Sequence, residues 1–158
     1  MPPILFETDT PLCLFGGGPI APQDWERVSV FQPECLAADG GAETAERLGL
    51  GQRLRGIVGD LDSLNNLERW RNSRVPVHHL TEQDSTDFEK CLYSTKAPLT
   101  FGLGFLGARV DHGLAALNVL YRHAAKPIIL VKKDDIAFLS PTRLTLCLPP
   151  GCRISIFP

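Results

Sequence analysis

The chain has 158 residues, of which 44% are hydrophobic, and its formal net charge is −2. These values are typical of one compact domain with a sizeable core, and the small negative charge argues against a nucleic-acid-binding surface. No apolar run is long enough to span a membrane, and the N-terminus lacks the pattern of a secretory signal. We therefore expect a cytoplasmic protein whose five cysteines are free thiols.

Short apolar runs alternate with helical patterns along the first 134 residues. The apolar runs occupy 12–15, 34–38, 56–58, 75–80, 99–107 and 127–132. Helical patterns follow at 42–48, from about 64 to 70, up to 92, and up to 123. This rhythm predicts an α/β fold with a mostly parallel sheet and helices on both faces, Rossmann-like in arrangement.

The pattern changes near Asp134. Three strand-like runs follow, IAFL, RLTLCL and RISIF, separated by turns and with no helix between them. The run RLTLCL alternates at period two, which is typical of a half-buried antiparallel strand. We expect residues 1–134 to form a nucleotide-binding catalytic domain and residues 135–158 to begin a β domain that is incomplete. Alternatively, these strands complete an edge of the main domain.

Two aspartates, Asp60 and Asp62, directly follow an apolar run in the segment GDLDS. Residues two apart in an extended segment project to the same side, so both carboxylates can bind one hard cation such as Mg²⁺. Leu61 would then turn back into the core. The simpler interpretation is that Asp62 or Ser63 caps a helix that begins near Leu64.

The next polar segment is EQDSTDFEK. Thr86 or Ser85 is a natural helix cap, and Asp87 falls in the first turn, where the helix dipole favours a carboxylate. Asp87 and Lys90 share one helix face, so a surface ion pair is the simple interpretation. The functional interpretation places Asp87 on a metal ion, Lys90 on a phosphate, and Gln83 and Thr86 in polar contacts.

The segment GARVDH brings Arg109, Asp111 and His112 to a helix start. Arg109 supplies a forked donor that suits phosphate. His112 is more simply a helix-terminal residue satisfied by the backbone. The following apolar residues recur at helical spacing and are expected in the core: Leu114, Leu117, Leu120 and Tyr121.

All of these loops follow predicted strands, and the carboxyl ends of parallel strands meet at one edge of a sheet. The loops GGGP and DGGA also lie there, and their glycines allow the backbone to approach a ligand. Neither loop matches GxxxxGK[ST] or GxGxxG. Carboxylates with Mg²⁺, Lys90 and Arg109 would bind a nucleotide, which points to phosphoryl-group chemistry driven by positioning and charge neutralisation.

The set of motifs resembles that of the thiamine pyrophosphokinase family. The DGGA, GDxDS, DQDxTDxxK and GxRxDH segments of that family read here as Asp39–Ala42, Gly59–Ser63, Glu82–Lys90 and Gly107–His112. The match covers most of the chain, from about Leu12 to Lys132. Three departures stand out: Glu82 replaces an aspartate, Ala116 replaces an expected asparagine, and the β domain is cut short.

The resemblance implies transfer of a diphosphate from ATP to the thiamine hydroxyl, giving thiamine diphosphate and AMP. It implies Mg²⁺ held by Asp60, Asp62 and Asp87, with Asp39 close by and Arg109 completing the catalytic group. It implies ATP contacts from Gln83, Thr86, Lys90, Arg109 and Asp111, with Asp39 beside them. It also implies a homodimer with active sites in clefts between subunits, acting on ATP and thiamine and binding neither nucleic acid nor membrane.

Three other functions fit part of the pattern. A pyrophosphokinase with another acceptor, such as a pterin alcohol, would use the same donor site. A nucleotide-binding or regulatory module would keep the polar edge without catalysis. The DLD sequence also fits the D-x-D metal motif of nucleotide-sugar transferases, which does not explain the other loops.

Overall fold

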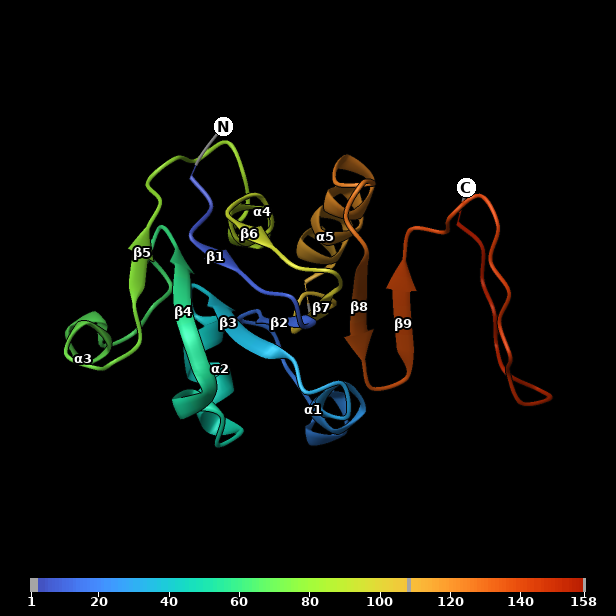
Figure 1. Ribbon diagram of the computed structural model, residues 1–158, viewed down its shortest axis with the longest axis horizontal. Coiled ribbons are helices and arrows are strands. Elements are labelled where there is room, and N and C mark those ends of the chain that lie inside the picture. The colour runs from blue at the N-terminus through green and yellow to red at the C-terminus, as the bar shows by residue number, and fades with distance from the viewer. Residues whose placement is uncertain (1–2, 108, 158) are drawn as a thin grey trace.

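The computed structural model describes residues 3–107 and 109–157, so Ala108 and Pro158, which belong to segments discussed above, lie outside the described residues. Its main feature is a seven-stranded sheet of order β5-β4-β3-β2-β7-β8-β9 (Figure 1). The strands are β2 (Leu12–Phe15), β3 (Glu34–Ala38), β4 (Leu54–Gly59), β5 (Val77–His79), β7 (Thr100–Leu103), β8 (Ile128–Lys132) and β9 (Asp135–Phe138). All neighbours pair in parallel except β8 and β9, which confirms the predicted fold class.

Both faces of the sheet are buried, which explains why its strands read as short apolar runs rather than as alternating ones. In β2, Cys13 and Phe15 belong to one hydrophobic cluster, whereas Leu12 and Leu14 belong to the other. Side chains two residues apart thus share a face, as an extended chain requires.

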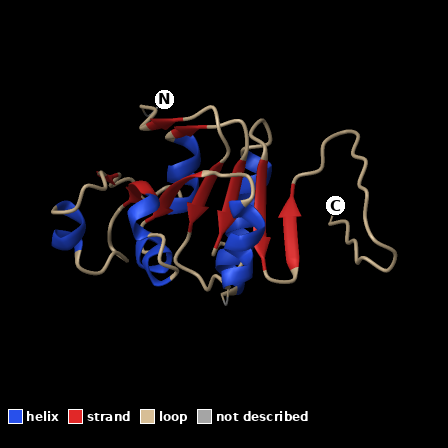
Figure 2. Cartoon of the chain, turned by 60° about the horizontal axis from the view of Figure 1, so that its bottom comes forward, coloured by secondary structure: helices blue, strands red, loops and turns tan. Residues whose placement is uncertain are grey.

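Helices cover the two faces (Figure 2). The first cluster receives side chains from α1 (Pro22–Ser29), α2 (Gly41–Arg47) and α3 (Leu67–Arg71). The second receives side chains from α4 (Asp87–Tyr93) and α5 (Val110–Arg122). A short 3₁₀ helix (Gly51–Arg53) leads into β4, and β1 (Phe6–Glu7) pairs with β6 (Thr95–Lys96) in a separate small sheet. No helix of the described residues is long and apolar enough to cross a membrane.

The strand order places a crevice at the carboxyl ends of β2 and β7. After β2 the chain continues through α1 to β3 on one side, whereas after β7 it continues through α5 to β8 on the other. Ligands of open α/β sheets bind where connections diverge in this way. We therefore expect a ligand to bind at the loops that follow these central strands.

The C-terminal segment departs from the expected three strands. The first strand exists as β9, which extends the main sheet by pairing with β8. The strands expected at 143–148 and 153–157 were wrong, because the structure assigns no strand there and a strand needs a neighbour to pair with. Several apolar side chains of this segment are exposed: Leu144, Leu146, Leu148, Ile154, Ile156 and Phe157. A second domain beginning at residue 135 stays a prediction.

Helix α5 carries an apolar stripe that faces away from the sheet. We define the α5 stripe as Val110, Leu114 and Tyr121, whose exposed fractions are 78%, 60% and 73%. The expectation that Leu114 and Tyr121 lie in the core was wrong. Their spacing puts them on one flank of the helix, whereas Val119 and Leu120 face the sheet from the other.

Candidate active site

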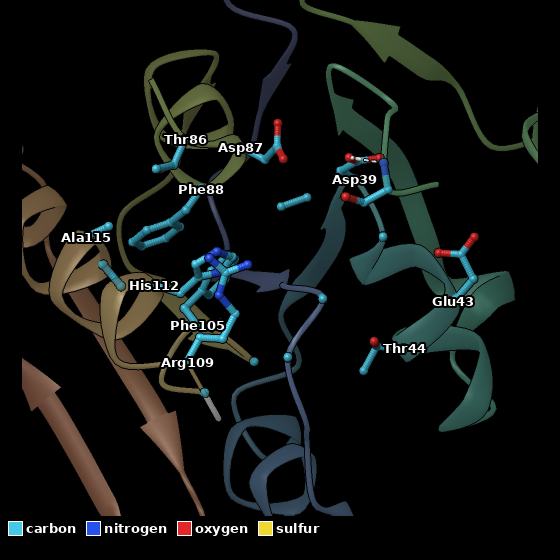
Figure 3. A pocket seen from close by; sticks show the side chains of 18 of the residues that line it. Asp39, Glu43, Thr44, Thr86, Asp87, Phe88, Phe105, Arg109, His112 and Ala115 are labelled. Atoms are coloured by element: carbon cyan, nitrogen blue, oxygen red, sulfur yellow. Dashed lines mark hydrogen bonds between the residues drawn. The ribbon is translucent and has the colours of Figure 1, made fainter. Parts of the chain in front are cut away.

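A cleft of about 770 Å³ opens at the carboxyl edge of the sheet. Figure 3 shows α2 on one side of it and α4 and α5 on the other, with Asp39 and Asp87 between them. Its lining includes residues from the GGGP loop after β2, the DGGA loop after β3, the GDLDS loop after β4 and the loop after β7. These loops therefore converge on one edge of the sheet, as expected.

Three carboxylates converge in this cleft. Asp39, Asp60 and Asp62 each offer one oxygen, and these oxygens lie within 4.8 Å of one another. Leu61 adopts a left-handed backbone conformation (φ 67°) and turns its side chain into the core, as predicted. This turn leaves the two flanking aspartates together on the cleft side, and the fold adds Asp39 from the neighbouring strand end. We call Asp39, Asp60 and Asp62 the aspartate triad.

Asp39 is the buried member of the triad, with an exposed fraction of 2%. Its Oδ2 accepts the Ser63 N–H at 3.0 Å, whereas its Oδ1 has no hydrogen-bond partner among the described residues. Burial raises the pKa of Asp39 to about 6; the Ser63 bond opposes this rise, and the charges of Asp87 and Asp60 add to it. An unpartnered carboxylate oxygen beside two further carboxylates fits the oxygen ligands that Mg²⁺ prefers.

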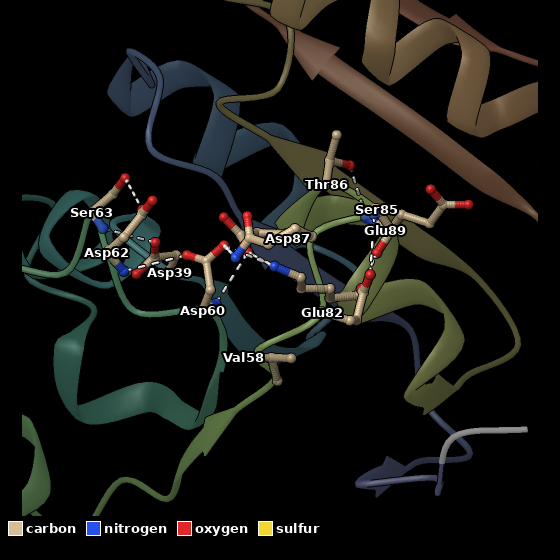
Figure 4. Close-up of polar contacts among 12 residues, drawn as sticks. Asp39, Val58, Asp60, Asp62, Ser63, Glu82, Ser85, Thr86, Asp87 and Glu89 are labelled. Carbon is tan, nitrogen blue, oxygen red and sulfur yellow. Dashed lines mark hydrogen bonds and ion pairs between the residues drawn. The ribbon is translucent and has the colours of Figure 1, made fainter.

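Lys90 is an ammonium group buried among carboxylates, with an exposed fraction of 1%. Its Nζ donates to Asp60 Oδ2 at 3.0 Å and to Asp87 Oδ1 at 3.1 Å. Figure 4 labels these two aspartates, which lie side by side. Burial alone would lower the pKa of Lys90, but its hydrogen bonds to Asp60 and Asp87 outweigh burial and raise it. Asp87 therefore faces Lys90 and lies outside the triad. Metal binding by Asp87 and phosphate binding by Lys90 stay predictions.

The two predicted helix caps have different outcomes. Thr86 caps α4, since its Oγ1 accepts the Glu89 N–H at 3.3 Å, which confirms that prediction. A helix that begins near Leu64 with a cap at Asp62 or Ser63 was wrong. Helix α3 begins only at Leu67, after a left-handed residue at 66, and the Ser63 N–H is bound to Asp39 instead.

Of the remaining predicted site residues, only Gln83 contacts the acidic group, and Asp111 is not part of the cleft lining. Gln83 donates from Nε2 to Asp60 Oδ2 at 3.2 Å. Arg109 lines the cleft and donates to both carboxylate oxygens of Asp111, at 3.1 and 2.5 Å, and both side chains are exposed. Their contacts with ATP stay predictions, as does that of Thr86.

Some lining residues were not singled out from the sequence. Phe88 and Phe105 stack with ring centroids 4.2 Å apart, and both line the cleft together with Ala116. Glu43 and Thr44 of α2 line the opposite side. Phe105 follows a glycine at a strand end, a weak signal for a residue at a ligand site. The alanine that replaces an expected asparagine thus adds to an apolar part of the cleft.

Glu82, the residue that replaces an aspartate, organises its own loop. Its Oε2 accepts the N–H groups of Asp84 at 2.9 Å and Ser85 at 3.2 Å, and its Oε1 accepts the Tyr93 hydroxyl at 2.9 Å. The longer side chain therefore ties the loop before α4 to the last residue of that helix.

Fold and cleft together define a doubly wound α/β protein whose cleft lies at the switch point of its parallel sheet. Comparison with protein families is more specific. The model of the thiamin pyrophosphokinase catalytic domain matches residues 29–131, and the chain belongs to this family.

Similar proteins carry the same name. Thiamine pyrophosphokinase 1 of Arabidopsis thaliana is 34% identical over 131 residues, which cover 67% of this chain and 49% of the relative. Thiamine pyrophosphokinase 1 of Oryza sativa subsp. japonica is 30% identical over 146 residues, covering 77% of this chain and 54% of the relative. The crystal structure of thiamin pyrophosphokinase from Geobacillus thermodenitrificans has a TM-score of 0.62 at 26% identity, covering 77% of this chain and 59% of that one. The chain spans about half the length of the curated relatives it matches.

The raised pKa of Asp39 predicts how Mg²⁺ should affect stability at different pH. Because its pKa is raised, Asp39 stabilises the metal-free fold when its carboxyl group is protonated. This contribution to the free energy of unfolding is fully present below pH 3.8, the ordinary pKa, and is lost as the pH rises through about 6. Above that pH the ionised carboxylate can bind Mg²⁺, so added Mg²⁺ should raise the unfolding temperature there and have little effect below it. Thermal unfolding with and without Mg²⁺ across this range measures the effect.

Asp39→Asn is the control, and it should remove most of the pH dependence of the Mg²⁺ effect. An equal Mg²⁺ effect on both sides of pH 6 in the wild-type protein would contradict the assignment of the buried carboxyl to the cation site.

Proposed function

We propose that the chain is the catalytic α/β region of an ATP- and Mg²⁺-dependent diphosphotransferase that converts thiamine to thiamine diphosphate, with AMP as the second product. The observation that carries the proposal is the aspartate triad in a cleft that also contains Lys90 and Arg109. Carboxylates alone would repel a nucleotide, whereas carboxylates with a divalent cation and two basic side chains would bind one. Membership of the family supports thiamine as the acceptor.

Different residues of the chain would have different roles in such a transfer. Bound Mg²⁺ would neutralise charge on the phosphate oxygens, and the triad carboxylates are the groups to hold it. Arg109 presents a forked donor for phosphate oxygens at the cleft wall. Two of the three Lys90 donors are bound to carboxylates, which leaves one for a phosphate. The acceptor hydroxyl would attack the β-phosphorus in line and pass its proton to one of the cleft carboxylates, and AMP would leave as the bond between the β-phosphorus and the α,β-bridging oxygen breaks.

The direct test supplies purified protein with ATP, Mg²⁺ and thiamine and separates the products by chromatography. The proposal expects AMP and thiamine diphosphate in equal amounts, and neither product when Mg²⁺ is chelated. AMP formed with a pterin alcohol but not with thiamine would reassign the acceptor. Calorimetric binding of Mg²⁺–ATP without AMP from any acceptor would indicate a nucleotide-binding module instead.

We also propose that the chain forms a homodimer and that the α5 stripe lies in its interface. The support is physical: Val110, Leu114 and Tyr121 are large, apolar, aligned and exposed on one helix flank. Leu114→Glu should therefore shift the molar mass measured by light scattering from dimer to monomer. The control is Gln52→Glu, an exposed polar position of the 3₁₀ helix before β4 and not on α5, which should leave the dimer intact. A monomeric wild-type protein would contradict this proposal.

The cytoplasmic location stays a proposal too. All five cysteines are free, and Cys13, Cys35 and Cys91 are buried. Free thiols together with ATP as co-substrate suit a reducing compartment. Fractionation of cells that express the tagged full-length protein would test the location.

A further inference from the structure

We infer that the Lys90 ammonium occupies the place of a second divalent cation, so that the cleft binds one such ion rather than two when no nucleotide is present. The inference rests on one part of the proposed function, namely that the aspartate triad takes a divalent cation. It concerns the number of ions, on which the family relationship alone does not bear.

Asp60 has the position of a carboxylate shared by two cation sites. It belongs to the triad, and its Oδ2 also accepts the Lys90 Nζ at 3.0 Å. In Figure 4, Asp60 lies between Asp39 on one side and Asp87 on the other. Two-metal sites for phosphoryl transfer hold their ions roughly 3.5–4 Å apart, close enough for both ions to contact one shared ligand. Here one of the two places contains an ammonium.

The contacts of Lys90 resemble those of a bound cation. Its Nζ contacts one oxygen of Asp60 and one of Asp87, at 3.0 and 3.1 Å, and its side chain is almost fully buried. Asp87 Oδ1 also accepts the Asp60 N–H at 3.4 Å, so the two carboxylates are held together around the ammonium. A buried charge in such a setting is stable only with its partners, which fixes Lys90 between them.

The balance of charges in the cleft also favours one divalent cation over two. Asp39, Asp60, Asp62 and Asp87 carry four negative charges when ionised, and Lys90 reduces this sum to three. One divalent cation in the triad then leaves a single negative charge, whereas two divalent cations together with Lys90 would leave a net positive one. Without Lys90, the Asp60 and Asp87 carboxylates would face each other with no counter-ion of their own.

The test counts Mn²⁺ ions bound per chain by the full-length protein, using electron paramagnetic resonance of free Mn²⁺ in a titration without nucleotide or acceptor. We expect one ion in the wild-type protein and two in Lys90→Met, which keeps an unbranched side chain as far as Cε and removes the ammonium group. The matched control is Lys96→Met, because Lys96 is also paired with a carboxylate but is 69% exposed and lies away from the cleft. It should bind one ion.

Two ions or none in the wild-type protein would overturn the inference, as would a folded Lys90→Met protein that binds one ion. The titration contains neither ATP nor thiamine. The ion count and the AMP assay are therefore independent. A failure to form AMP would contradict the proposed function only, and a wrong ion count would contradict this inference only.

Folding gives a second readout. Because Lys90→Met leaves Asp60 and Asp87 without a counter-ion, Mn²⁺ should raise its unfolding temperature more than that of the wild-type protein. The double variant Lys90→Met/Asp87→Asn lacks a ligand of the second place and should show neither the second ion nor the larger shift. If Lys90→Met is unfolded without metal, circular dichroism should show refolding with Mn²⁺. Absence of that rescue would contradict the inference.

Discussion

Asp60→Asn should lower the rate of AMP formation by about 10³-fold while leaving the protein folded. Asp60 is a member of the triad and also accepts hydrogen bonds from Lys90 and Gln83. Asparagine keeps the size of the side chain but removes the negative charge, so it weakens the cation site and leaves the ammonium with one carboxylate. Steady-state rates with ATP, Mg²⁺ and thiamine, together with circular dichroism, measure the two effects.

The matched control is Asp9→Asn. Asp9 is exposed, lies before β2 outside the matched motifs and is not part of the cleft lining, so the same chemical change should leave the rate within a factor of about two. Full turnover by folded Asp60→Asn would refute the metal role assigned to this carboxylate.

Gly41→Ala should destabilise the fold by about 4 kcal/mol or more, which places it among the most severe single substitutions. A Cβ at this position would lie 2.5 Å from the carbonyl carbon of Phe15 and closer still to its oxygen. The clash is with the backbone of central strand β2, which cannot move aside. Helix α2 would have to withdraw and take Ala42 and Ala45 out of the core. Urea denaturation or the yield of soluble protein measures the loss.

Gly113→Ala provides the contrast. A Cβ on Gly113 would meet no atom within 4 Å, and alanine favours a helix over glycine by about 1 kcal/mol. This variant should therefore be as stable as the wild-type protein or more stable. An unchanged denaturation midpoint for Gly41→Ala would contradict the close approach of α2 to β2. In that case the glycine would serve only the role that the sequence suggested, which was to let the backbone approach a ligand.

The main sheet was predictable because its strands are buried on both faces. Apolar runs such as LCLF and ECLAA stand out from the helical segments that cover them, and they became β2 and β3. The position of the polar loops followed from the same pattern, since parallel strands end at one edge. Helix α1 was not expected, and the short strands β1 and β6 are too brief to leave a pattern in the sequence.

Other features of the site depend on contacts that no local pattern encodes. Asp87 and Lys90 looked like a surface pair at helical spacing, but Asp60 from 30 residues earlier joins them and Lys90 is buried. Asp39 enters the triad because its left-handed backbone (φ 44°) and its bond with Ser63 hold the carboxylate in place. The contact of Asp60 with Lys90 exists only after α4 has packed on β4, and that of Asp39 with Ser63 only after β3 and β4 have paired.

The direction of α5 was ambiguous for a different reason. Apolar residues occur on both flanks of this helix. The periodicity therefore predicts a helix but does not indicate which flank packs against the sheet. The structure turns Val119 and Leu120 inward and leaves Leu114 and Tyr121 outside. In the segment after β9, alternation predicted strands that have no neighbour among the described residues.

The central claim is that Asp39, Asp60 and Asp62 hold a divalent cation in the cleft at the carboxyl edge of the sheet. Anomalous diffraction from crystals grown with Mn²⁺ and a non-hydrolysable ATP analogue tests it most directly. We predict a Mn²⁺ peak in contact with carboxylate oxygens of all three residues and with a phosphate oxygen of the nucleotide. A nucleotide bound in the cleft with the Mn²⁺ peak away from these three carboxylates would contradict the claim.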